Sequence, residues 1–155
     1  MLNRVTIAFL FILCLCSCNE IGLYEKVVFT PSQQWSQSFQ PEIKFTITDT
    51  SSLYRIYFNV RHADAYPYNN LWIKLYSRMP GDSSEKQERF DIPLADGKQW
   101  LGSSMDDIYN HRVLLYKEAV KFTKPGEYYL RISHDMRIDP VKYIFNLGVR
   151  IEKVK

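Results

Sequence analysis

The chain has 155 residues, and its 20 Lys and Arg residues nearly balance its 17 Asp and Glu residues, giving a formal net charge of +3. A charge this close to neutral, with no stripe of basic residues, argues against a nucleic-acid-binding protein. There are only 6 Gly and 7 Pro, so the composition is not that of a low-complexity chain. The length suits one domain with a substantial core.

The first residues have the pattern of an export signal. Arg4 is the only charged residue before Glu20, and the stretch 5–16 is almost entirely apolar. This run fits a signal-peptide core of about 7–15 residues and is shorter than the ~17–25 residues that cross a bilayer. Residues 1–17 are therefore predicted to be a lipoprotein signal peptide that is cleaved.

The cysteines explain the end of that signal. Cys14, Cys16 and Cys18 are the only cysteines in the chain. Ser17 and Cys18 match a bacterial lipobox, which needs a small residue before the cut and, after it, a thiol that accepts the lipid. Cys18 is thus predicted to be lipidated, and residues 18–23 to form a short tether. A zinc site is disfavoured because it would need about four ligands, which this short apolar run does not supply. An uncleaved membrane anchor is the remaining alternative.

Hydrophobic residues alternate with polar ones through the rest of the chain, which is typical of half-buried antiparallel strands. In the run 144–153, for example, Phe145, Leu147, Val149 and Ile151 are predicted to point inward. The predicted strands are a run that begins near Tyr24 and the segments 42–48, 53–62, 71–77, 89–94, 128–133 and 144–153.

Turn residues separate these strands, with Asp, Pro and Gly clustered between them. The segment 112–122 is predicted to hold two short strands with a bend, and the only helix candidate is 103–110. About eight strands and at most one short helix predict an all-β antiparallel β-sandwich of jelly-roll or immunoglobulin-like type. Residues 24–155 are predicted to form this single domain.

The chain shows no motif of a catalytic or metal site. His62, His111 and His134 lie far apart in the sequence, outside any zinc-protease motif. Asp106 and Asp107 precede His111 at a spacing that metal ligands tolerate, but such residues more often form turns. Because nucleophile elbows and phosphate-binding glycine loops are also absent, we expect no enzyme activity, no metal and no cofactor. A hydrolase would need a cleft that gathers these side chains.

One dense stretch, 61–72, combines polar and aromatic residues between two strands, as expected of a binding edge. In the alternative interpretation, Tyr66 and Tyr68 only pack the edge, while Asn69 and Asn70 satisfy loop amides. The candidate interaction rim consists of Arg61, His62, Asp64, Tyr66, Tyr68, Asn69, Asn70, Trp72, Asp106 and Asp107.

Three blocks resemble a known family. They are RHADAYPYNNLW at 61–72, WLGSSMDDIY at 100–109 and MRIDP at 136–140. These blocks, within a likeness that extends from Tyr24 to Lys153, resemble the GldH family of gliding-motility lipoproteins of Bacteroidetes. The resemblance implies an envelope lipoprotein of the gliding apparatus, which is tied to type IX secretion, and assigns no catalytic residue. Cys18 is the one functional residue that carries over.

We therefore expect a non-enzymatic lipoprotein, held to a membrane by the lipid on Cys18, that docks other envelope or gliding-apparatus proteins. A second hypothesis is carbohydrate or peptidoglycan binding on Trp and Tyr surfaces, and it weakens if Trp35, Trp72 and Trp100 are all buried.

Surface-displayed lipoproteins of these bacteria often carry acidic residues after the lipidated cysteine, whereas here Glu20 stands alone. The outer membrane, with the domain facing the periplasm, is the expected location.

Overall fold

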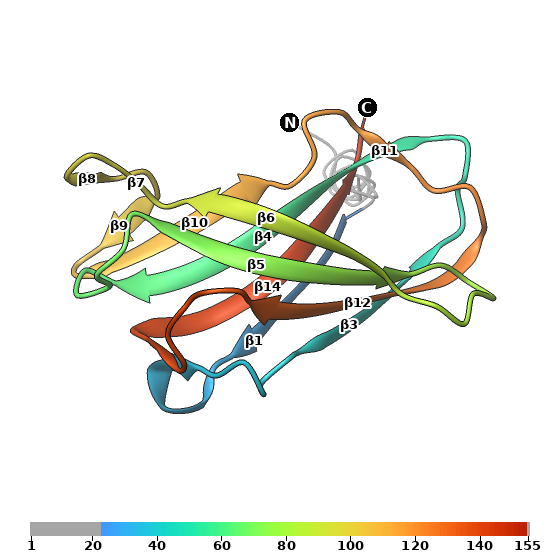
Figure 1. Ribbon diagram of the computed structural model, residues 1–155. Coiled ribbons are helices and arrows are strands. Elements are labelled where there is room, and N and C mark those ends of the chain that lie inside the picture. The colour runs from blue at the N-terminus through green and yellow to red at the C-terminus, as the bar shows by residue number, and fades with distance from the viewer. Residues whose placement is uncertain (1–22, 155) are drawn as a thin grey trace, which may run out of the picture.

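Two antiparallel sheets face each other in the computed structural model, which describes residues 23–154 (Figure 1). The predicted signal peptide and Cys18 lie outside the described residues. The large sheet runs in the spatial order β1 (Leu23–Phe29), β14 (Ile144–Lys153), β4 (Leu53–Ala63), β10 (Ile108–Leu114) and β9 (Ser103–Met105), with β11 (Val120–Lys121) also paired to β4. The small sheet runs in the order β3 (Glu42–Ile47), β12 (Gly126–His134), β5 (Asn70–Arg78) and β6 (Lys86–Pro93).

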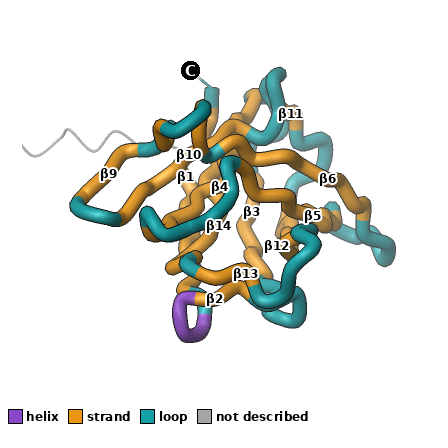
Figure 2. The backbone as a smooth tube through the Cα atoms, turned by 60° about the vertical axis from the view of Figure 1, so that its left-hand side comes forward, coloured by secondary structure: helices purple, strands orange, loops and turns teal. Residues whose placement is uncertain are grey.

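Short ribbons complete the described part of the fold: β2 (Gln34–Trp35) pairs with β13 (Val141–Lys142), and β7 (Ala95–Asp96) pairs with β8 (Gln99–Trp100). Figure 2 shows the two main sheets as separate layers. If the eight long strands are numbered in chain order, the sheets read 1-8-3-6 and 2-7-4-5, which is the jelly-roll arrangement. The prediction of an all-β antiparallel sandwich is confirmed.

The core lies between the sheets, as the two-residue period requires. Along β3, Ile43, Phe45 and Ile47 are buried and the residues between them are exposed. Phe58 of β4 and Ile132 of β12 are fully buried from opposite layers. All predicted strands are present, and the segment 112–122 does contain the end of β10 and the short β11.

Two local predictions are wrong. The helix expected over 103–110 is a hairpin: β9 and β10 pair antiparallel, and Asp106 in the turn has φ of 52°, a left-handed conformation that Asp tolerates. Phe145 is not a core residue, because a β-bulge shifts the register of β14 between Ile144 and Asn146. Ile144 is fully buried in its place. Within residues 23–154 the only helical element is the 3₁₀ turn η1 (Pro31–Gln33).

The ends of the described chain lie together, at the opposite end of the sandwich from the β9–β10 turn. Leu23 pairs with Glu152 and Tyr54 with Lys153, whereas Ala63, at the other end of β4, pairs with Ile108. The 11 residues of β4 span about 35 Å at the usual rise of a strand. Figure 1 shows β7, β8 and β9 on the left, far from the C-terminus.

Replacement of Phe58 by Ala should lower the free energy of unfolding by about 3–5 kcal/mol, because it leaves a cavity against Trp35, 6.5 Å away between ring centroids. Denaturant unfolding followed by circular dichroism measures the loss. Leu53→Ala is the matched control, since Leu53 is 44% exposed. An equal loss in both variants would contradict the core described here.

Candidate functional site

Two buried histidines meet at the end of the sandwich formed by the β4–β5 connection, the β7–β8 ribbon and the β9–β10 turn. His62 and His111 are 49 residues apart in sequence, yet their Nε2 atoms lie 2.9 Å from each other. The register of β10 on β4 causes this, because it pairs His111 with Val60, and Val60 and His62 are inward-facing neighbours on β4. His62 is fully buried and His111 is 5% exposed.

The hydrogen bonds assign the tautomers of the pair. Nδ1 of His62 lies 2.7 Å from the carbonyl oxygen of Ala63, so it carries the proton and donates it. Its Nε2 then accepts, and Nε2–H of His111 is the donor. Burial lowers the pKa of His62, although the carbonyl of Ala63 and the charge of Asp64 oppose this. Burial, and then repulsion from His62, lower the pKa of His111 to about 4. Both rings are neutral at pH 7.

Aromatic rings surround this histidine pair. The ring of His62 is 4.5 Å from Trp100, 5.2 Å from Tyr66 and 5.7 Å from Tyr109, measured between centroids. Gly102 allows the close packing: a Cβ there would lie 2.9 Å from the His111 ring and 2.4 Å from a backbone carbonyl oxygen. We call these five side chains (His62, Tyr66, Trp100, Tyr109 and His111) the histidine cluster.

Polar residues of the predicted rim cover this cluster. Trp100 Nε1 donates to Oδ1 of Asp64 at 2.8 Å, and the Asp64 backbone N–H donates to the carbonyl of Asp107 at 2.8 Å. The Tyr66 hydroxyl donates to the carbonyl of Asn70. The backbone carbonyl of Asn69 accepts hydrogen bonds from the backbone N–H groups of Leu94 and Ala95. The side chain of Asn69 is exposed.

The predicted rim is divided between three faces. Asp64, Asn69, Asp106 and Asp107 are exposed at the end of the sandwich, while His62 and Tyr66 are buried beneath them and Tyr68 and Asn70 are half-buried beside them. Arg61 points out of the large sheet, on the opposite face of β4 from His62. Trp72 lies on the outer face of the small sheet. From here on, the exposed rim means Asp64, Asn69, Asp106 and Asp107.

The alternation of inward and outward residues along β4 predicts that His62 is buried. Its contact with His111 cannot be predicted without knowing that β10 pairs with β4. Among residues 23–154, no group of three His, Cys, Asp or Glu side chains could hold a metal ion. The two histidines bond to each other rather than to a nucleophile. The arrangement is that of a packed and uncharged cluster.

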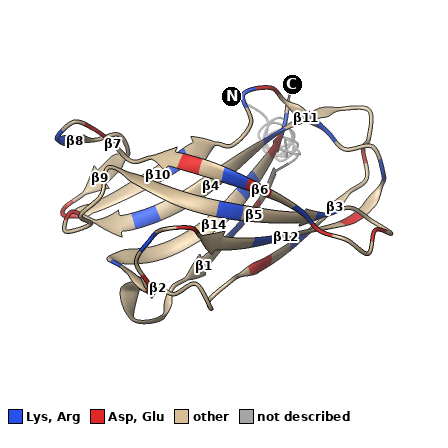
Figure 3. Cartoon of the chain, viewed as in Figure 1, with Lys and Arg blue, Asp and Glu red and all other residues tan. Residues whose placement is uncertain are grey.

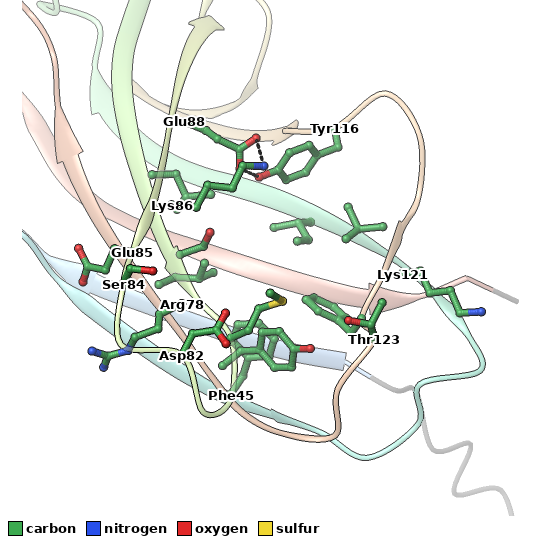
Figure 4. Close-up of a pocket in the computed structure, with 18 residues that line it drawn as sticks. Phe45, Arg78, Asp82, Ser84, Glu85, Lys86, Glu88, Tyr116, Lys121 and Thr123 are labelled. Carbon is green, nitrogen blue, oxygen red and sulfur yellow. Dashed lines mark hydrogen bonds and ion pairs between the residues drawn. The ribbon is translucent and has the colours of Figure 1, made fainter.

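A pocket of about 350 Å³ lies between the sheets, at the far end from the histidine cluster (Figure 4). Phe45, Ile56 and Leu75 form part of its apolar floor. Several charged residues at its mouth have partners: Glu88, for example, accepts a hydrogen bond from Tyr116 at 2.8 Å and pairs with Lys86 at 3.1 Å. This pocket can hold an apolar group.

The outer face of the small sheet carries aromatic rings covered by guanidinium groups. Arg89 lies 3.8 Å from the ring centroid of Trp72, and Arg131 lies 4.0 Å from that of Tyr76. Figure 3 shows basic positions along β5 and both basic and acidic positions along the neighbouring β6. Trp35 is fully buried, whereas Trp72 and Trp100 are half-buried. The three tryptophans are therefore not all buried, but Arg89 covers one face of the Trp72 ring.

Comparison with known proteins decides the family. A family model described as GldH lipoprotein matches residues 22–151. The chain belongs to the GldH lipoprotein family. This is not a known enzyme family, and membership implies a membrane-anchored protein of the cell envelope. In residues 23–154, none of the helices has the length and apolar character needed to span a membrane.

Two curated relatives support the assignment. A protein of Christiangramia forsetii named gliding motility lipoprotein GldH homolog is 27% identical over 145 residues, covering 88% of this chain and 87% of its own. The gliding motility lipoprotein GldH of Flavobacterium johnsoniae is 25% identical over 145 residues, with 88% of each chain covered. The likeness to GldH relatives inferred from the sequence is thus confirmed.

Solved structures resemble the chain only distantly. A carbohydrate-binding module specific for non-crystalline cellulose, CBM28, has a TM-score of 0.44 at 11% identity, covering 82% of this chain and 71% of its own. The mosquito-larvicidal Cry4Aa toxin of Bacillus thuringiensis has a TM-score of 0.43 at 14% identity, covering 84% and 21%. Neither likeness bears on function.

The neutral histidine pair should make the domain lose stability as the pH falls from about 6.5 to about 4. In that pH window the histidines of the unfolded chain are protonated, whereas the buried rings of the folded chain stay neutral. This difference lowers the free energy of unfolding by up to ~1.4 kcal/mol per pH unit for each histidine. Urea unfolding at about pH 7 and about pH 4.5 measures the slope. In the double variant His62→Gln, His111→Gln the slope should be shallower, and an unchanged slope would contradict the assigned protonation states.

Proposed function

We propose that this chain is a non-enzymatic assembly component of the gliding-motility and type IX secretion apparatus. In this proposal a lipid on Cys18 anchors it to the outer membrane, the domain faces the periplasm, and the exposed rim docks another envelope protein. The observation that carries the proposal is the position of two features at opposite ends of the sandwich: the described chain begins at one end, and the exposed rim lies at the other.

The distances support docking away from the membrane. Leu23 lies five residues after Cys18 in the sequence, and five residues reach at most about 18 Å. A strand the length of β4 adds about 35 Å between the anchored end and the rim. An anchored domain would therefore be able to present Asp64, Asn69 and Asp107 well beyond the lipid surface, where a second envelope protein could contact them.

The exposed rim also has the chemistry of a modest protein contact. Its side chains are polar and exposed, and Asp64 is held in place by Trp100 of the histidine cluster and by a backbone hydrogen bond to Asp107. A rigid support of this kind reduces the ordering cost of binding. Anchoring near a membrane raises the effective concentration of partners, so weak contacts can suffice. A lipid anchor itself is strong only with more than one chain, because each buried CH₂ contributes about 0.8 kcal/mol.

The lipid anchor is tested by Cys18→Ala. The variant should move from the membrane fraction to the soluble fraction, because without the thiol no lipid can be attached. Cys16→Ala is the matched control and should stay membrane-bound, since it changes another cysteine of the same segment. Fractionation of cells that express each variant measures the outcome, and a Cys18→Ala protein still found in membranes would refute the anchor.

Docking through the exposed rim is tested by site-specific photo-crosslinking in cells. A photoreactive amino acid at Asn69 or Asp107 should give a discrete crosslinked adduct with an envelope protein, which mass spectrometry of the adduct can identify. Thr48, which is exposed in the turn at the opposite end, is the matched position and should give none. Equal adducts from Thr48, or none from the rim positions, would refute this use of the rim.

A further inference from the structure

The outer face of the large sheet has a polar depression of about 460 Å³. In its middle, Gly148 of β14 lies in register between Asn59 of β4 and Val27 of β1. A Cβ at Gly148 would lie 2.1 Å from the backbone carbonyl oxygen of Lys26, so only glycine fits there. No side chain therefore stands between Asn59 and Val27. We call this feature the Asn59 depression, and it is lined further by Arg61, Ser103, Asn110, Arg112 and Asn146.

Two polar atoms of the Asn59 depression are buried without a hydrogen-bond partner. They are Oδ1 of Asn59 and Nε of Arg61. Asn59 is only 8% exposed, and its Nδ2 donates to Oε1 of Glu25 at 2.7 Å, which fixes the amide. Its Oδ1 is thus an oriented acceptor that lacks a donor. Buried polar groups in native proteins are almost always hydrogen-bonded, so a ligand bound here would satisfy both atoms by donating to Asn59 and accepting from Arg61.

The charge around the Asn59 depression is positive. Glu25 is the one carboxylate in its lining, and Arg150 pairs with it at 2.6 Å. Arg112 lies 3.8 Å from the same carboxylate and has a half-exposed side chain, so its pairing is weak. Arg61 takes part in none of the ion pairs formed within residues 23–154. Two guanidinium groups are therefore available to an anion.

We propose that the Asn59 depression binds an acidic sugar. The carboxylate is held by Arg61 and Arg112, because guanidinium forks match carboxylate oxygens in charge and geometry. A hydroxyl or amide of the sugar donates to Oδ1 of Asn59, a need that a bare anion without O–H or N–H groups does not meet.

Neighbouring residues suit the rest of a sugar ring. The amides of Asn110 and Asn146 and the hydroxyl of Ser103 offer donors and acceptors for further hydroxyls. Phe29 is 73% exposed and lies next to Asn146 in register, which places an apolar ring beside the polar lining. An apolar surface with a few oriented polar groups is the usual composition of a small-molecule site. This site is distinct from the exposed rim, so it stands independently of the proposed docking function.

Calorimetric titration of the processed protein in detergent tests the proposal. N-acetylmuramic acid and N-acetylglucosamine share the same ring, and only the first carries a carboxylate. The acid should bind at least ~10-fold more tightly, since a charged hydrogen bond is worth that factor or more. Inorganic sulfate, which has no O–H group at neutral pH, should bind more weakly than the acid. Equal affinity for the two sugars, no binding of the acid, or sulfate binding as tightly as the acid would each overturn the proposal.

Variants connect the binding to this surface. Arg112→Gln and Arg61→Gln should each weaken binding of N-acetylmuramic acid by about tenfold or more. Arg55→Gln is the matched control, because Arg55 is exposed on the same face of β4 outside the depression, and it should leave the affinity unchanged. Arg112 is half-exposed, so its replacement tests binding even if Arg61→Gln disturbs folding. An unchanged affinity in Arg112→Gln, or an equal loss in Arg55→Gln, would refute the site.

Discussion

The alternation of β4 between its two faces is the constraint on which the rest of the structure depends. This strand pairs with β14 on one side and with β10 and β11 on the other. Phe58 points into the core and His62 into the histidine cluster, while Asn59 and Arg61 point out of the sheet. A register slip of one residue would exchange these two sets. The core, the support of the exposed rim and the polar depression are therefore all specified by a single register.

Much of this arrangement could be predicted from the sequence, because a two-residue period needs no knowledge of neighbouring strands. The long strands and the buried residues of β3 and β5 follow from local alternation alone. The histidine cluster does not follow, since His62 and His111 meet only after β10 has paired with β4. The role of Gly148 could not be predicted from the sequence either, because the backbone of β1 at Lys26 is what excludes a side chain there.

Local signals failed where the chain departs from regular strands. The segment 103–110 was predicted to be a helix, but a positive φ at Asp106 closes a hairpin there instead. The bulge in β14 turns Phe145 away from the core, and no residue type in that segment predicts a bulge. Both errors lie at turns or irregularities, where one residue's backbone angle decides the outcome. The candidate rim was divided for a related reason: residues adjacent in sequence on a strand face opposite sides, so Arg61 and His62 cannot serve one surface.

The position of β1 has a mechanical consequence. This strand begins at the end of the domain where the chain enters and runs toward the exposed rim, lying antiparallel along β14. A pull between a membrane tether and the rim would therefore act along β1 rather than across it. All seven residues of β1 would then resist together in shear, whereas a pull at a right angle would break their hydrogen bonds one after another. A jelly roll loaded in this direction would resist unravelling from β1 more strongly than one loaded across that strand.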